Sequence, residues 1–240
     1  RDDLVAKGLA PSSVTRVLTT IKAVINFAIQ EEGIELSNPF KGLFVDKSIG
    51  PKKRMPVPLS DLERVQKQCW NVDDDLRWIV AAISDTGCRM AEIVGLSKAD
   101  VRLDGDIPFI SISPKPWRRL KTASSERDIP LVGSALWGIT RAYQSTNSEM
   151  LFPRYNNGLY SNSNSASAAL SKWLKQQTKP DCTMHSFRHS FRDRLRAVEC
   201  PIELTDALGG WSTDGIGAAY GQGYSLQLKQ KWLSAIVLKP

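Results

Sequence analysis

The amino-acid sequence predicts a mostly α-helical fold that contains a small antiparallel β-sheet. Two observations support this class, and a third indicates how the chain is divided. Apolar residues recur at three- and four-residue spacing through most of the 240 residues, as they do in amphipathic helices. The period changes to two around residues 107–113 and 127–132, which is typical of short strands. A segment rich in Lys, Arg, Gly and Pro at residues 49–58 separates a small N-terminal part from a larger C-terminal part.

The N-terminal part, residues 1–48, contains one clear amphipathic helix. Ser12 or Ser13 is available as its N-cap, and Gly33 is placed to end it. The apolar stripe of this helix consists of Val14, Val17, Leu18, Ile21, Val24, Ile25, Ala28 and Ile29. We interpret the following segment, residues 49–58, as an extended basic linker, because consecutive basic residues are combined there with prolines and a glycine.

The larger part, residues 59–240, is expected to begin and end with helices. A capping-box sequence, Ser60 to Glu63, is expected to open a helix that runs to about Trp70. The two strands are expected to pair as a hairpin with a basic connection. Further helices are expected at residues 73–84, 133–145, 163–178, 185–198, 202–208 and 225–238.

The composition limits the classes of function. With 42% hydrophobic and 24% charged residues the chain is an ordinary globular protein, and no apolar run approaches the roughly 18 residues of a membrane span. Four widely spaced cysteines favour neither disulfides nor zinc, so we expect a protein of a reducing cytoplasm. The net charge of +7 is compatible with a polyanionic partner. Without a P-loop or a carboxylate cluster for Mg²⁺, no cofactor and no metal are expected.

Two short segments concentrate side chains that can act on a phosphate. Both histidines of the chain, His185 and His189, lie in one window with Arg188. On a helix these residues stand at i, i+3 and i+4, so we expect one cationic face that can transfer protons. Arg89 follows a glycine turn at the start of another expected helix, where backbone N–H groups and a guanidinium can bind a phosphate. Glu92 lies one turn further on, where it can orient Arg89 rather than react itself.

Four motifs follow one another along the larger part of the chain. They are T-G-x-R-x-x-E-I-x-G-L at residues 86–96, K-T-x-x-S-x-R-x-I-P-L at 121–131, H-S-F-R-H at 185–189 and L-G-G-W at 208–211, with Tyr220 behind the last. In order and spacing they resemble the tyrosine recombinases of the phage-integrase type over residues 55–240. Trp211 stands where many members have His. Trp is a known variant at that position. The resemblance implies that residues 1–48 are the C-terminal part of a helical core-binding domain and residues 59–240 the catalytic domain.

A nucleophile and a base are assigned on this resemblance and on side-chain chemistry. Tyr220 is the expected nucleophile, because small residues flank it and leave room for DNA to approach. Tyr224, four residues later, is its rival. His185 is the expected general base, since a neutral imidazole titrates near working pH, and His189 is a less favoured substitute.

The remaining roles concern the phosphate and the leaving group. Arg89 and Arg188 are expected to clamp the non-bridging oxygens with bidentate donors. Trp211 is expected to donate a hydrogen bond to one of these oxygens from its indole N–H. Lys121, on the connection between the strands, is the expected general acid, whereas Lys115 precedes a proline and lacks the following Thr.

Double-stranded DNA is therefore the expected partner. The basic residues expected to contact it are Lys52, Lys53, Arg54, Arg118 and Arg119. The resemblance implies a site-specific recombinase of a bacterium or phage that cuts and rejoins strands through a 3′-phosphotyrosine. It also implies a homotetramer on paired DNA sites, with residues 225–240 as an assembly segment. Two alternatives remain: a type IB topoisomerase-like enzyme that relaxes DNA, and a DNA-binding regulator or architectural relative that does not cut.

Overall fold

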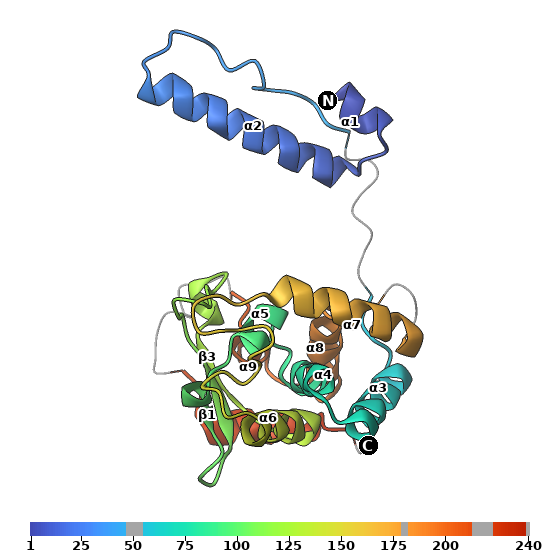
Figure 1. Ribbon diagram of the computed structural model, residues 1–240. Coiled ribbons are helices and arrows are strands. Elements are labelled where there is room, and N and C mark those ends of the chain that lie inside the picture. Colours follow the sequence, from blue (N-terminus) through green and yellow to red (C-terminus); the bar gives the residue numbers. More distant parts are fainter. Residues whose placement is uncertain (47–54, 179–181, 213–222, 239–240) are drawn as a thin grey trace. The chain divides into compact units, whose positions relative to one another are not determined.

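The computed structural model describes residues 1–46, 55–178, 182–212 and 223–238. The chain forms two compact units, Arg1–Lys53 and Arg54–Pro240 (Figure 1). The boundary between the units falls inside the basic segment of residues 49–58. Lys52, Lys53 and Arg54 themselves lie outside the described residues.

The first unit consists of the short helix α1 (Asp2–Ala6), the long helix α2 (Pro11–Glu31) and the segment that follows them. Ala10 precedes α2 and Pro11 is its first residue, so the expectation that Ser12 or Ser13 caps this helix is wrong. Proline is suited to this position because its fixed φ is already helical. The segment after α2 folds back on the helix, where the Asn38 amide donates to the Lys22 carbonyl at 2.9 Å.

The second unit is built around α4 (Asp75–Thr86), which lies between α3 (Leu59–Val72), α6 (Gly133–Ser145) and α8 (Ser186–Ala197) (Figure 1). Every residue from 79 to 86 is buried. A helix that is buried on all sides has to be apolar all round, and α4 largely is. It begins two residues later than expected, because the Asp74 carboxylate caps it by accepting a hydrogen bond from the Arg77 N–H at 2.9 Å.

The sheet of this unit has three antiparallel strands in the order β1 (Val101–Arg102), β2 (Phe109–Ile112) and β3 (Arg127–Pro130). Ile110 in β2 pairs with Val101 on one side and with Ile129 on the other, and all three side chains are buried. The predicted hairpin corresponds to β2 and β3. Strand β1 was not expected from the sequence, because two residues are too few to show an alternation. The predicted class, mostly α with a small antiparallel sheet, is confirmed.

The start of the second unit differs from the expectation in two details. Val57, which the sequence analysis placed in the linker, is 2% exposed, and its carbonyl accepts a hydrogen bond from the Ser190 hydroxyl at 2.8 Å. The predicted capping box at Ser60 is wrong, because α3 already begins at Leu59 and no side chain caps it. The Pro58 carbonyl instead starts the helix by accepting from the Leu62 N–H at 2.9 Å.

The remaining helices complete the second unit. They are α5 (Met90–Val94), α7 (Ser163–Gln177), α9 (Ile202–Gly209) and α10 (Leu226–Ala235), with 3₁₀ turns at Lys98–Asp100 and Ala123–Ser125. Helix α10 packs on β3 of its own unit: Leu233 is fully buried, and the Lys229 ammonium donates to the Asp128 carbonyl at 2.9 Å. The assembly role of residues 225–240 stays a prediction. None of the described helices is long and apolar enough to cross a membrane.

Candidate active site

The turn between α4 and α5 carries the first of the predicted site residues, Arg89. Gly87 ends α4 in the left-handed conformation, with φ +61°, and a Cβ there would lie 2.5 Å from the Phe191 ring. Only glycine is suited to such a position. Arg89 then stands directly before α5, and both oxygens of the Glu92 carboxylate hold it. Oε1 accepts from Arg89 Nη1 at 2.6 Å, and Oε2 accepts from the Arg89 backbone N–H at 2.9 Å.

A third residue in this cluster, Arg127, was given no role in the sequence analysis. Arg127 begins β3, is buried, and donates to Glu92 Oε2 at 3.0 Å and to the Leu208 carbonyl at 2.9 Å. Burial acts to raise the pKa of Glu92, but the charges and hydrogen bonds of Arg127 and Arg89 outweigh burial and hold this pKa below its ordinary value. The signal for Arg127 was a charged residue on the inward side of an alternating strand, which is stable only when it is paired.

Two consecutive backbone carbonyls connect the predicted arginines. Arg188 donates to the Gly87 carbonyl and, from Nη2, to the Gly209 carbonyl at 2.9 Å. Arg89 Nη2 donates to the next carbonyl, that of Gly210, at 3.3 Å. The structure thus brings together the residues of the T-G-x-R, H-S-F-R-H and L-G-G-W motifs.

Arg188 is 3% exposed, and burial lowers its pKa to about 10. Its guanidinium therefore remains charged at neutral pH. Within the described part of the chain, no carboxylate forms an ion pair with it. A buried cation that donates to carbonyl groups and is not paired with a carboxylate is favourably placed to receive an anion.

The arrangement on α8 differs from the expected single face. Arg188 belongs to the buried side of the helix, together with Phe187 and Phe191. His185, which precedes the helix, and His189 are exposed, and their rings meet edge to face at 5.3 Å. The prediction that all three side chains share one face is therefore wrong, because the buried stripe of α8 is wide enough to include position 188.

Trp211 follows the glycine pair that ends α9. Gly210 has φ +63°, and a Cβ on Gly209 would overlap the Trp211 ring, so the indole folds back over the glycine main chain. The centre of its ring is 4.8 Å from the Cζ atom of Arg188 and equally far from that of Arg192. Among the residues that the structure describes, none accepts a hydrogen bond from the indole N–H.

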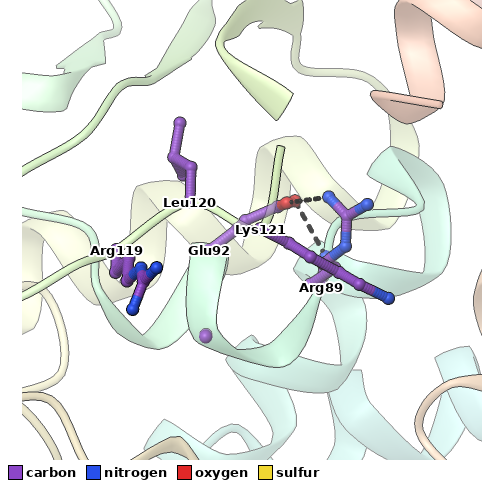
Figure 2. A pocket seen from close by; sticks show the side chains of 6 residues that line it. Arg89, Glu92, Arg119, Leu120 and Lys121 are labelled. Carbon is purple, nitrogen blue, oxygen red and sulfur yellow. Dashed lines mark hydrogen bonds and ion pairs between the residues drawn. The ribbon is translucent and has the colours of Figure 1, made fainter. Parts of the chain in front are cut away.

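A pocket of about 370 Å³ opens beside Arg89 and Glu92. Figure 2 shows the side chains that line it, with the Glu92 carboxylate bonded to Arg89. Arg119 and Lys121 reach this pocket from the connection between β2 and β3. The rival general acid, Lys115, is instead paired with Asp100 at 3.3 Å and does not line the pocket.

Arg118 is buried, contrary to the expectation from the sequence. It was expected to contact DNA, yet it is 2% exposed. Its guanidinium pairs with Asp100 Oδ2 at 3.1 Å and donates to the Ser113 carbonyl at 2.8 and 3.0 Å. A DNA contact from this residue is therefore excluded in this conformation. The connection between the strands folds inward at Arg118 and outward at Arg119, which is exposed.

Several predicted residues lie outside the described residues. These are the expected nucleophile Tyr220 and the linker residues Lys52, Lys53 and Arg54. The rival nucleophile, Tyr224, is described and is 39% exposed. In the described ranges, no group of three or more His, Cys, Asp or Glu side chains is arranged to hold a metal ion.

Comparison with known proteins places this site in a family. The model of the phage integrase family matches residues 62–224. No curated protein matches the chain. The integrase of transposon Tn1549, bound to circular intermediate DNA, has a similar fold, with a TM-score of 0.59 and 17% identity over 90% of this chain and 80% of that one.

Two further solved structures share the fold. For a lambda integrase tetramer bound to a Holliday junction, the TM-score is 0.63 and the identity 18%, over 90% of this chain and 62% of that one. XerA recombinase has a TM-score of 0.52 and 16% identity, over 93% and 78% of the two chains. Because the family model covers more than half of the chain and the ordered motifs converge on one site, the chain belongs to the phage integrase family of tyrosine recombinases.

Proposed function

We propose that this protein is a site-specific DNA recombinase that cuts and rejoins double-stranded DNA through a covalent 3′-phosphotyrosine. The observation that carries the proposal is the pair of arginines from different motifs, Arg89 and Arg188, that donate to the adjacent carbonyls of Gly210 and Gly209. Two cationic forks at one place fit the two non-bridging oxygens of a phosphodiester.

The arginines would act on the charge that develops during the reaction. Attack on a phosphodiester gives a transition state with extra negative charge on the non-bridging oxygens, and preorganised donors stabilise that charge. Each donor of this kind contributes on the order of 3 kcal/mol. Arg89 is held by Glu92, and Arg188 by the Gly87 and Gly209 carbonyls, so neither has to be ordered when the DNA arrives.

In the proposed reaction the Tyr220 hydroxyl attacks the phosphorus, and the bond to the 5′-oxygen breaks. A phenol is only about 0.1% ionised at pH 7, a deficit of roughly 4 kcal/mol, so a base has to take its proton. We assign this proton to His185, with His189 as its substitute.

The departing 5′-oxygen also needs a proton, which we assign to Lys121. Lys121 lines the same pocket as Arg89, which supports this role. Trp211 donates its indole N–H to a non-bridging oxygen, and Arg119 contacts the DNA backbone near the pocket. The step balances without a cofactor: the energy of the phosphodiester is kept in the phosphotyrosine, and a 5′-hydroxyl of another strand reverses the attack.

We further propose that exchange takes place in a homotetramer on two DNA sites. The lambda integrase of similar fold is a tetramer on a Holliday junction, which supports this assembly. The Tn1549 integrase is bound to circular intermediate DNA, which supports double-stranded DNA as the partner.

A nicked duplex from the native attachment site tests the proposal, because loss of the short fragment beside the cut prevents religation. The protein is incubated with this duplex in EDTA, and the products are separated on a denaturing gel. We expect a covalent protein–DNA band for the wild type and none for Tyr220→Phe, since phenylalanine has no nucleophilic oxygen. Tyr224→Phe is the matched control and should still form the band.

Three outcomes would contradict parts of the proposal. A band that persists in Tyr220→Phe and vanishes in Tyr224→Phe would show that Tyr224, and not Tyr220, is the nucleophile. A band that needs Mg²⁺ would contradict the metal-free step. Absence of the band on a duplex that the wild type binds would contradict strand cleavage and favour a DNA-binding relative that does not cut.

A further inference from the structure

The indole of Trp211 contacts two arginines that lie one turn apart on α8. The Cζ atoms of Arg188 and Arg192 are each 4.8 Å from the centre of the ring. This is within the range at which a guanidinium is attracted to an aromatic ring, and tryptophan gives the strongest attraction of this kind. The orientation of the indole therefore depends on both cations.

The two arginines are held by different groups. Arg188 donates to the Gly87 and Gly209 carbonyls and is the residue that the proposed function assigns to the phosphate. Arg192 forms an ion pair with Asp206 on α9, with 3.0 Å between Nη2 and Oδ1. Its contact with the ring is thus independent of the phosphate.

Asp206 fixes the main chain of Trp211 as well. The Asp206 carbonyl accepts a hydrogen bond from the Trp211 N–H at 3.0 Å, while its carboxylate holds Arg192. One residue therefore fixes both the start of the tryptophan side chain and the cation beside its ring. The Arg192–Asp206 ion pair thus joins α8 to the end of α9, next to the indole that lies beside Arg188.

We propose that Arg192 is a positioning residue that holds Trp211 so that the indole N–H meets a non-bridging oxygen of the scissile phosphate. This inference rests on the proposed function. When a phosphate binds, the guanidinium of Arg188 is shared between the phosphate and the glycine carbonyls. Arg192, anchored on Asp206, keeps the ring in place during that exchange.

A double-mutant cycle tests this role. The rate of covalent complex formation is measured in a single turnover, on the nicked duplex, for the wild type, Arg192→Met, Trp211→Ala and the double variant. We expect Arg192→Met to slow the reaction by about tenfold to a hundredfold, the effect of a small misplacement of a reacting group. In the Trp211→Ala background the same substitution should cause no further slowing, because residues that act through each other are not additive. The dissociation constant for DNA, measured separately, should stay near that of the wild type.

Two further variants serve as controls. The first control is Arg196→Met. Arg196 lies one turn further along α8, is exposed and is paired with Asp193 at 3.2 Å. This variant should react at the wild-type rate. Arg192→Lys keeps a cation that can pair with Asp206, so it should recover most of the rate that Arg192→Met loses.

The outcomes separate this inference from the proposed function. If the wild type forms no covalent complex, the proposed function itself fails. If the wild type reacts, the inference alone is overturned when Arg192→Met reacts at the wild-type rate, or when it slows the reaction equally in both backgrounds. If the melting temperature shows that Arg192→Met is unfolded, the cycle is run with Asp206→Asn in its place, because this variant removes the carboxylate that holds Arg192. The same two results then overturn the inference.

Discussion

Arg118 and Arg119 are adjacent in the chain and lie in opposite environments. Arg118 is almost fully buried and pairs with Asp100, which is itself 2% exposed. Arg119 is exposed beside Lys121 at the pocket. The first side chain stabilises the base of the connection between β2 and β3, and the second is available to a ligand.

The two neighbours are therefore expected to differ in their effect on stability. Arg118→Ala leaves the buried Asp100 carboxylate with Lys115 as its remaining cationic partner, beside two hydrogen bonds from Ser97, so it should lower the free energy of unfolding by about 3 kcal/mol. Arg119→Ala should change it by less than about 0.5 kcal/mol, as is usual for exposed positions. Urea unfolding of both variants measures the difference. Equal destabilisation would show that Arg118 is not the anchor.

The residues of the site could be predicted where a motif contained them. Arg89 and Arg188 are found together in the structure, and Lys121 lies at the pocket, because the spacing of each motif fixes its place on a turn or helix. Arg127 and Arg192 were missed. Arg127 stands in a motif, and its position in a strand indicates that it is paired, but the sequence does not show which carboxylate it meets. The partners, Glu92 and Asp206, lie on other elements than the arginines, and only the fold brings each pair together.

At the scale of elements, α10 depends on contacts with its own unit. Its last turn is tied to α8 by a hydrogen bond from Arg194 Nη1 to the Ile236 carbonyl at 3.0 Å. Burial lowers the pKa of Lys229, which lies on the same helix against β3. The helix is thus held by polar contacts at both ends and by apolar packing between them.

Two leucines of α10 offer a matched comparison. Leu233 is fully buried and Leu228 is 38% exposed. Leu233→Ala should lower the free energy of unfolding by about 3 kcal/mol, since it leaves a cavity in the core. Leu228→Ala should cost less than about 1 kcal/mol, because much of its surface is already in water. Thermal or urea unfolding of both variants measures the two changes in the free energy of unfolding. A small effect of Leu233→Ala would mean that α10 leaves its unit in solution.

Helices were easier to predict than their ends. The spacing of apolar residues predicted α2, α4, α6 and α8 to within a few residues, because that spacing indicates which residues of a helix are buried. The starts of α2 and α3 were misplaced because a proline beside the first turn replaced the expected side-chain caps. In these two helices the geometry of the backbone outweighs the preference of serine for the cap.

For the whole molecule, the net charge of +7 leads to a prediction about DNA binding. The logarithm of the affinity should fall linearly with the logarithm of the salt concentration, with a slope of about −0.9 for each phosphate neutralised. Six contacts would then weaken binding roughly a thousandfold between about 50 and 200 mM salt. Fluorescence anisotropy with labelled duplex measures the slope.

Arg119→Ala is the control for this titration, and it should reduce the magnitude of the slope by about one. Arg118→Ala, if folded under the assay conditions, should leave the slope unchanged, because its guanidinium is buried against Asp100. An affinity that does not respond to salt would contradict a site built to bind phosphates.

The glycine carbonyls that hold Arg89 and Arg188 have a consequence for mutational scanning. Truncation of side chains leaves main-chain oxygens in place, so alanine substitution at the non-glycine positions will assign the whole framework to the arginines. The acceptors become visible only when the path of the chain is displaced, as a Cβ at Gly209 or Gly210 would do. Neighbouring residues can therefore be substituted without loss of the hydrogen bonds that hold Arg89 and Arg188, provided that these glycines remain.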